Sequence, residues 1–391
     1  MKKKTLIICS RRTKSAPRLY NIYHTLNVKY DIFIAGDSKP EYLPKNKFKD
    51  ISSKDKFLSR FKKSLALISY FSLYPIKFSH LKFVLKPNAF ALFKKLEIEK
   101  FEIVVLHHID LLPIIHYLKL KHQFKLVLNI HEYYPREFDN QKSWISLKLF
   151  WEELCHKFMP SVDLFLSVNN TISSEYIKNF SLDKNKFIFF PNVKKFVSLK
   201  PINNFNHSIK LVHHGAAIPS RKIENMIKLM DFLPQNFELT LILLERNPEY
   251  YKYLKSFECQ RINFLTPIDF DKIPEHLNCY DIGIYFLEPS NFNEENSLPN
   301  KFFEFIQARI CLAITPLNEM SKIVLDNDLG FVSKNFNVKH FAQELSKISK
   351  EEILIFKKNV DKIAPKYSLK FYKEIILNEF EKLQFEHIFE K

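Results

Sequence analysis

The chain has 391 residues but only four glycines, Gly36, Gly215, Gly283 and Gly330, and none of them lies near another. A dinucleotide-binding loop of the G-x-G-x-x-G type needs three clustered glycines, and a P-loop also needs a glycine-rich turn. Both kinds of nucleotide site are therefore excluded. We expect each isolated glycine to mark a backbone position that tolerates no side chain.

Long apolar runs and paired cysteines are also missing. The longest apolar stretch, residues 65–74, is well short of the roughly 20 residues that a membrane-spanning helix needs. The first apolar run after Met1 ends at Cys9, which is too short for a signal peptide. The five cysteines include no C-x-x-C pair and are expected to be reduced core thiols. These absences predict a cytoplasmic protein, soluble or peripheral to a membrane.

What the chain has in excess is positive charge. Its 60 Lys and Arg residues outnumber 43 Asp and Glu residues, which gives a formal net charge of +17. Such a charge favours nucleic acid, an anionic membrane surface or phosphorylated substrates as partners, although an AT-rich genome would also enrich lysine. Because the basic residues are dispersed and form no RNP, helix-turn-helix or zinc module, no nucleic-acid partner is expected. A basic nucleic-acid-binding protein stays as an alternative.

Short apolar runs alternate with helical patterns such as 144–159 and 172–180 over almost the whole chain. The runs are nearly continuous, which is typical of parallel strands covered on both faces. The predicted strands are 5–9, 31–35, 103–106, 126–130, 164–168, 187–190, 209–213, 239–244, 262–265, 282–285, 311–314 and 330–332. This alternation predicts an α/β fold of two doubly wound, Rossmann-like sheets.

The polar segment 191–208 is interrupted by prolines and has no hydrophobic period, so we interpret it as an interdomain linker. The predicted domains are 1–195 and 196–365, followed by a C-terminal part, 366–391, whose amphipathic helix packs back toward the joint. Two such domains leave a cleft faced by the strand C-termini of both sheets. Open α/β sheets bind their ligands there.

The segment 298–308 carries the most informative motif. Pro299 suits the first turn of a helix, which places Asn300 and Lys301 at its N-terminal end. Free backbone N–H groups and the lysine charge favour an anion there. Glu304 lies one turn further on the same side and could accept both hydroxyls of a ribose. The alternative is a Lys301–Glu304 pair on a solvated helix face.

A second phosphate-facing arrangement follows the predicted strand 209–213. Gly215 comes directly after this strand, and Arg221 and Lys222 are predicted to begin the next helix. The guanidinium would then stand beside a helix N-terminus. A basic first turn without a ligand is the alternative, which the helix dipole disfavours.

Histidines close two predicted strands of the first domain. Asn129 and His131 end one strand, while His107 and His108 end the strand before it, so the two groups should be neighbours across the sheet. Pro135 stands four residues after His131, which excludes a zincin helix. No thiol partner or ligand spacing supports a metal, and packing is the favoured role of His107 and His108 individually. We therefore expect no metal.

These motifs, in this order, resemble the retaining GT-B glycosyltransferases of family 4 over nearly the whole chain. The similar segments are 107–113, 131–135, 190–193, 298–305 and 311–316. The resemblance implies that Glu304 binds the ribose of the donor and that Arg221 grips its diphosphate. It also implies that His131 approaches the transferred sugar and that Glu319 occupies a commonly acidic position.

Two positions depart from the family pattern. Asn296 stands where the family often carries a second Glu, and Ala216 stands after Gly215 where the family often has Arg. A non-catalytic partner subunit of the same fold is therefore one alternative function. A nucleotide-sugar epimerase that shares the architecture is another.

The resemblance implies transfer of a sugar, with retention, from a UDP- or GDP-linked donor to a glycan or a polyprenyl- or other lipid-linked acceptor, in bacterial cell-surface polysaccharide synthesis such as that of lipopolysaccharide or capsule. No metal or cofactor is needed, because Arg221, Lys301 and helix N-termini would stabilise charge on the leaving diphosphate. Gly215, Asn300, Glu304 and Glu319 complete the expected donor site. A leaving phosphate oxygen would accept the proton of the acceptor.

The segment 54–86 alternates basic residues with aromatic and aliphatic ones. As a helix it could lie in an anionic interface, which predicts peripheral attachment at the inner face of the plasma membrane. The alternative is a core-packed helix with a solvated basic face.

Overall fold

The computed structural model describes residues 2–9, 13–51, 96–142, 144–203 and 208–389. Its contacts divide the chain into two compact units. Unit 1 comprises Met1–Pro191 and Lys373–Lys391, and unit 2 comprises Asn192–Tyr372. The first joint thus falls within the polar segment 191–208. The basic and aromatic segment 54–86 lies outside the described residues.

Unit 1 contains a seven-stranded parallel sheet with the order β3-β2-β1-β4-β5-β6-β7. The inner strands are mostly apolar and buried, and β4 is entirely so, with all four of its residues buried. The strands are β1 Lys4–Cys9, β2 Asp31–Gly36, β3 Phe48–Asp50, β4 Ile103–Leu106, β5 Lys125–Ile130, β6 Leu164–Ser167 and β7 Phe187–Phe189.

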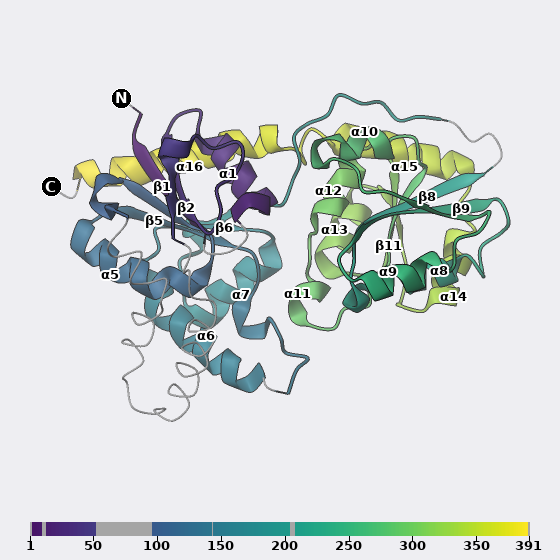
Figure 1. The fold of residues 1–391 in the computed structure, drawn as a ribbon, viewed down its shortest axis with the longest axis horizontal. Coiled ribbons are helices and arrows are strands. Elements are labelled where there is room, and N and C mark those ends of the chain that lie inside the picture. Colours follow the sequence, from purple (N-terminus) through teal and green to yellow (C-terminus); the bar gives the residue numbers. More distant parts are fainter. Residues whose placement is uncertain (1, 10–12, 52–95, 143, 204–207, 390–391) are drawn as a thin grey trace. The chain divides into compact units, whose positions relative to one another are not determined.

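Helices cover both faces of this sheet. The strand order reverses direction at β1, so right-handed crossovers place α1 on one face and the helices after β4 on the other, as Figure 1 shows. The helices are α1 Pro17–Leu26, α5 Leu112–His122, α6 Trp144–Phe158, α7 Asn170–Phe180 and α16 Leu369–Phe389. Within unit 1, the last helix packs on the turn between α1 and β2, where the rings of Tyr30 and Phe380 lie 5.9 Å apart.

Unit 2 repeats the design with a six-stranded parallel sheet of order β10-β9-β8-β11-β12-β13. The reversal of strand order falls between β8 and β11, the point at which open α/β sheets bind ligands. The strands are β8 Ile209–Ala217, β9 Phe237–Glu245, β10 Ile262–Leu265, β11 Ile282–Tyr285, β12 Cys311–Ile314 and β13 Gly330–Val332.

The helices of unit 2 are short, and several begin with a capping side chain. Ser349 and Glu352 form a reciprocal capping box at the start of α15, which satisfies two backbone N–H groups. The helices are α8 Glu224–Leu229, α9 Pro248–Lys255, α10 Ile273–Leu277, α11 Phe292–Glu295, α12 Asn300–Gln307, α13 Asn318–Asp326, α14 Val338–Leu345 and α15 Lys350–Ile363.

The predicted strands agree closely with the observed ones. The strands 103–106, 262–265, 282–285, 311–314 and 330–332 match residue for residue. Strand β8 continues beyond the predicted end at His213 to Ala217. Strand β3 was not predicted, because three partly exposed or exposed residues at a sheet edge carry no clear apolar pattern.

The prediction for the isolated glycines is confirmed. A Cβ on Gly283 would lie 2.5 Å from Cγ of Phe305, and one on Gly36 would lie 2.2 Å from Oγ1 of Thr13. Gly330 has a φ of +153° and its Cβ would meet the carbonyl oxygen of Leu312 at 2.0 Å. Helices and backbone therefore approach these strands closer than any side chain permits.

All five cysteines are free thiols. Cys9, Cys155 and Cys311 are buried as predicted, but Cys259 and Cys279 are exposed. Within the part of the chain that the structure describes, no helix combines the length and the apolar character needed to cross a membrane.

Candidate functional site

The candidate site of unit 2 lies where β8 and β11 end and α12 begins. The two strands are neighbours at the centre of the sheet, and parallel strands present their carboxyl ends at one edge. His213, His214 and Gly215 lie in the last part of β8, Tyr285 ends β11, and Lys301 is in the first turn of α12. Residues far apart in sequence thus meet at the reversal point of the sheet.

Gly215 and Lys301, both predicted from the sequence, come together. Lys301 Nζ lies 3.1 Å from His213 Nε2 and 5.2 Å from the centre of the Tyr285 ring. A Cβ on Gly215 would lie only 2.9 Å from the same Nζ, and the φ of Gly215 is +141°. A glycine is therefore required here both by the backbone conformation and by the space that the ammonium occupies.

His213 holds Lys301 without adding charge. Its Nδ1 lies 2.9 Å from the carbonyl oxygen of Ile284, which can only accept, so Nδ1 carries the proton and Nε2 offers a lone pair. Burial, and then the charge of Lys301, place the pKa of His213 well below its ordinary value. Burial and then Arg221 lower the pKa of Lys301 to about 7, against the opposing effect of Glu304.

Arg221 approaches the same edge from the loop after β8. Its guanidinium donates to the hydroxyl of Tyr285 at 3.4 Å, while the side chain stays exposed. The prediction that Arg221 and Lys222 begin a helix is wrong. Arg221 ends a 3₁₀ turn that starts at Pro219, Lys222 has a φ of 45°, and α8 begins at Glu224. The first turn of α8 thus receives an acidic residue, as the helix dipole favours.

Glu304 is buried, with 3% of its surface exposed. Its Oε1 lies 2.8 Å from Lys194 Nζ, and its Oε2 lies 3.2 Å from His214 Nε2 without the alignment of a hydrogen bond. The alternative of a solvated Lys301–Glu304 pair is therefore wrong. A buried carboxylate with an ammonium partner is held in one place, because leaving either charge alone in the interior is costly.

The other residues around α12 have distinct places. Asn296 is buried, donates to the carbonyl of Phe292 at 2.8 Å and accepts from Asn318 at 2.9 Å, so it ties the loop before α12 to α13. Asn300 and Glu319 lie in the first turns of α12 and α13. Backbone N–H groups in such turns have no partner within their helix and favour an anion.

Sequence reasoning missed Lys194, His213, His214 and Tyr285. The pair of histidines directly before Gly215 is a polar group at the end of a predicted strand, a signal that could have found them. Lys194 has no local signal, since it lies in the polar linker, where its backbone pairs with that of Ser368.

In unit 1, His131 follows β5 and His107 and His108 follow β4, and the predicted proximity of these strand ends is confirmed. The ring of His107 lies 4.4 Å from that of His131 and 5.0 Å from that of His108. Burial is the largest cause that places the pKa of His107 and of His131 well below the ordinary value, and the charges of the neighbouring histidines act in the same direction. His131 lies in unit 1, whereas Arg221 and Lys301 lie in unit 2.

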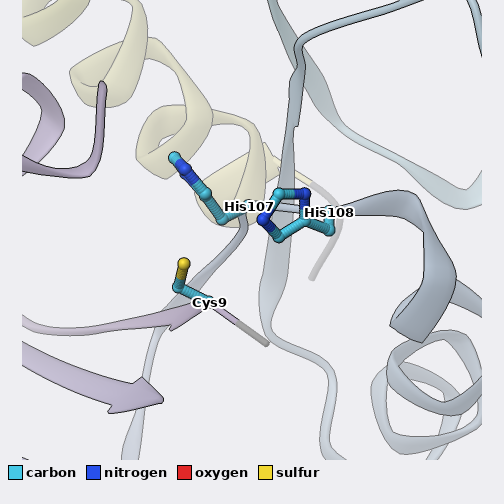
Figure 2. Close-up of side chains that lie close together, drawn as sticks. All are labelled: Cys9, His107 and His108. Carbon is cyan, nitrogen blue, oxygen red and sulfur yellow. The ribbon is translucent and has the colours of Figure 1, made fainter. Parts of the chain in front are cut away.

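The expectation that no thiol accompanies these histidines is wrong. Cys9 ends β1, the neighbour of β4, and Figure 2 shows its side chain close to those of His107 and His108. Its sulfur lies within 4.8 Å of ligand atoms of both histidines. A thiol and two imidazoles suit zinc chemically. However, His107 Nδ1 lies 3.0 Å from the amide nitrogen of Asn129, so its lone pair is already used. Coordination by His107 at this atom would break that hydrogen bond, and we assign no metal to the group.

No protein-family model matches the sequence, and no similar sequence is found among curated proteins. Solved structures do resemble the chain. HepE from Anabaena in complex with UDP-glucose has 11% identity and a TM-score of 0.69, with 97% of this chain and 99% of that chain covered. A glycosyltransferase from Rickettsia africae has 13% identity and a TM-score of 0.68, with 98% and 99% covered.

The lipopolysaccharide outer core galactosyltransferase WaaB, in its apo form, has 11% identity and a TM-score of 0.64, with 97% of this chain and 99% of that chain covered. Together with the two parallel sheets of seven and six strands, these likenesses confirm the predicted fold class: α/β, GT-B, with two Rossmann-like doubly wound domains.

Proposed function

We propose that this protein is a glycosyltransferase that uses a nucleotide diphosphate sugar, UDP- or GDP-linked, as its donor. The observation that carries the proposal is Lys301, held by His213 in front of Gly215 at the reversal point of the unit 2 sheet. The fold supports it, because HepE shares the fold and was solved with UDP-glucose, and WaaB shares the fold and is a galactosyltransferase.

The diphosphate of the donor would lie against Lys301, Arg221 and the first turn of α12, with Gly215 giving its backbone close access. Glu304 would accept the ribose hydroxyls. A carboxylate has two oxygens with about four lone-pair sites, so Glu304 can keep Lys194 on Oε1 and still accept further hydrogen bonds. Asn300 and Glu319 would complete the site from the first turns of their helices.

The reaction would proceed with retention and without a metal at the diphosphate. The bond between the sugar anomeric carbon and the phosphate oxygen breaks, while the acceptor hydroxyl oxygen bonds to that carbon on the same face. The hydroxyl proton passes to the departing phosphate oxygen. Lys301 and Arg221 stabilise the charge that grows on the leaving diphosphate, the contribution that usually dominates such catalysis. His131 would contact the transferred sugar.

The acceptor we propose is a glycan or a polyprenyl- or other lipid-linked sugar, in cell-surface polysaccharide synthesis at the cytoplasmic face of the membrane. The net charge of +17 supports an anionic surface or a phosphorylated carrier as partner. The naming of WaaB as an outer core galactosyltransferase is consistent with this setting.

The test is a thermal-shift panel of UDP, GDP, ADP, CMP and their common sugars on wild type and on Glu304→Gln. We expect one nucleotide to raise the melting temperature of wild type and to do so much less in the variant. Asp281→Asn is the matched control, because Asp281 is another buried carboxylate of unit 2 that pairs with a lysine, Lys357, at 3.5 Å. A panel in which no nucleotide stabilises wild type, or in which Glu304→Gln responds like wild type, would contradict the proposal.

A further inference from the structure

A buried polar chain runs through unit 1 from Arg18 on α1 to two histidines. Arg18 is 3% exposed, and its Nε donates to Asn129 Oδ1 at 2.5 Å. The same guanidinium donates to the carbonyls of Leu166, at 3.3 Å, and Phe190. An arginine can only donate, so the atom of Asn129 that faces it must be the oxygen. The orientation of the Asn129 amide is thereby settled by chemistry.

The amide nitrogen of Asn129 must then face the imidazoles. It lies 3.0 Å from His107 Nδ1 and 2.9 Å from His131 Nε2. An amide nitrogen has two hydrogens and no acceptor capacity, so each of these ring nitrogens must accept and be unprotonated. His107 therefore carries its single proton on Nε2, and His131 carries its single proton on Nδ1.

We propose that Asn129, oriented by Arg18, is a positioning residue that fixes His131 as a neutral N–H donor through Nδ1. The inference rests on the proposed function where it assigns this donor to the transferred sugar. His131 has no lone pair left for the proton of an acceptor hydroxyl, since Nε2 accepts from Asn129 and Nδ1 is protonated. His131 is therefore not the general base, and its one N–H, which also faces the backbone carbonyl of His107, is the only hydrogen that it can offer to a sugar oxygen.

The surroundings of His131 oppose a second proton. Burial is the largest cause that lowers the pKa of His131, followed by the charges of His107 and His108 from the end of β4 and of Arg18 from α1, against the smaller opposing effect of a hydrogen bond to the backbone of His107. A proton on Nε2 would also point at the hydrogens of the Asn129 amide. The same tautomer is therefore expected over the range in which an ordinary histidine titrates, about pH 5 to 8.

The direct test is a two-bond ¹H–¹⁵N correlation spectrum of the full chain with ¹⁵N-labelled histidine. Signals of His107 and His131 are assigned from the spectra of His107→Gln and His131→Gln. We expect a neutral ring with the proton on Nε2 for His107 and on Nδ1 for His131, unchanged across that pH range. A proton on Nε2 of His131, or a doubly protonated ring at neutral pH, would overturn the inference.

The sharpest variant is Asn129→Asp, which keeps the shape but replaces the donating amide nitrogen by an accepting oxygen. His131 must then donate from Nε2, so its tautomer inverts or its ring becomes doubly protonated. The matched control is Asn169→Asp. Asn169 is another buried asparagine of unit 1, and its Oδ1 caps α7 by accepting from Ile172 N at 2.7 Å. An aspartate serves equally well as a cap, so the His131 signal should stay as in wild type.

If Asn129→Asp folds with His131 unchanged, the inference fails. If the variant does not fold, the wild-type spectrum decides by itself.

Turnover separates this inference from the proposed function. Asn129→Asp should lower kcat by about a hundredfold to a thousandfold, as loss of one oriented donor does, and should make kcat depend on pH near neutrality. The KM for the donor should change little, because the proposed nucleotide contacts lie in unit 2. An unchanged kcat and pH profile would overturn the positioning role. Absence of any sugar-nucleotide turnover in wild type would instead contradict the proposed function and leave the tautomer result standing.

Discussion

Lys301 Nζ lies 3.1 Å from His213 Nε2, while the other ring nitrogen of His213 donates to the carbonyl of Ile284. The imidazole is thereby a neutral acceptor with a fixed direction. It orients the ammonium but does not neutralise it, so the charge of Lys301 remains available to an anion at the start of α12.

The first prediction concerns the pH dependence of nucleotide binding. In the free protein the pKa of Lys301 is lowered to about 7, so the side chain loses its proton above that pH. A bound diphosphate favours the ammonium form, and binding above pH 7 therefore takes up a proton. We expect the affinity for the nucleoside diphosphate to fall as the pH rises above about 7, by at most about tenfold per pH unit. Calorimetric titration over this range measures it.

Lys301→Arg is the control for this pH dependence. A guanidinium stays charged throughout, so the affinity of the variant should be nearly constant with pH even if it is weaker. Titration of the phosphate itself affects both proteins equally and cancels in the comparison. An equal pH dependence in both proteins would show that another group is responsible.

The second prediction is for Gly215→Ala. The new Cβ would lie 2.9 Å from Lys301 Nζ, and the φ of +141° is strained for any residue with a side chain. We expect a loss of about 1–3 kcal/mol in stability and a weaker affinity for the donor, because Lys301 must move. Gly36→Ala is the matched control, since it crowds Thr13 in unit 1. It should lower stability but leave nucleotide affinity unchanged.

The third prediction tests the ion pair of Lys194 and Glu304. Lys194→Met removes the ammonium and leaves a carboxylate that is only 3% exposed without its cation. Breaking such a pair costs about 3–5 kcal/mol of unfolding free energy, measured by denaturant titration. The double variant Lys194→Met with Glu304→Gln has no unpaired charge at this position. It should therefore regain most of the unfolding free energy that Lys194→Met loses. A double variant no more stable than Lys194→Met would show that the pair is not the source.

The fourth prediction is for Arg221→Ala. Arg221 is exposed and donates only to the Tyr285 hydroxyl among its described contacts, so stability should change by less than about 0.5 kcal/mol. Turnover should fall about a hundredfold, because one cation facing the leaving diphosphate is lost. Lys222→Ala is the neighbouring control, since Lys222 pairs with Glu288 on the surface. Steady-state kinetics measures turnover in both variants. If Arg221→Ala turns over as fast as wild type, Arg221 does not contribute to the site.

Most of the fold could be predicted from the sequence, because parallel strands buried on both faces are continuous apolar runs. Five strands match residue for residue, and the others differ mainly at their ends. The edge strand β3 could not be predicted, since its three residues, none of them buried, need no apolar pattern. The predicted start of the helix after β8 was a few residues too early. Lys222 adopts a left-handed conformation, so α8 begins only at Glu224, and the sequence does not indicate that conformation.

The sequence by itself determined which residues lie at strand ends and helix starts, because apolar periodicity and glycine scarcity are local signals. Gly215, Lys301, Glu304 and His131 were found in this way. Only the tertiary structure decided their partners: Lys194 for Glu304, and Arg18, through Asn129, for the histidines. Such pairs join residues about a hundred or more positions apart, and a side chain carries no local mark of the charge or hydrogen-bond donor that chain topology brings to it.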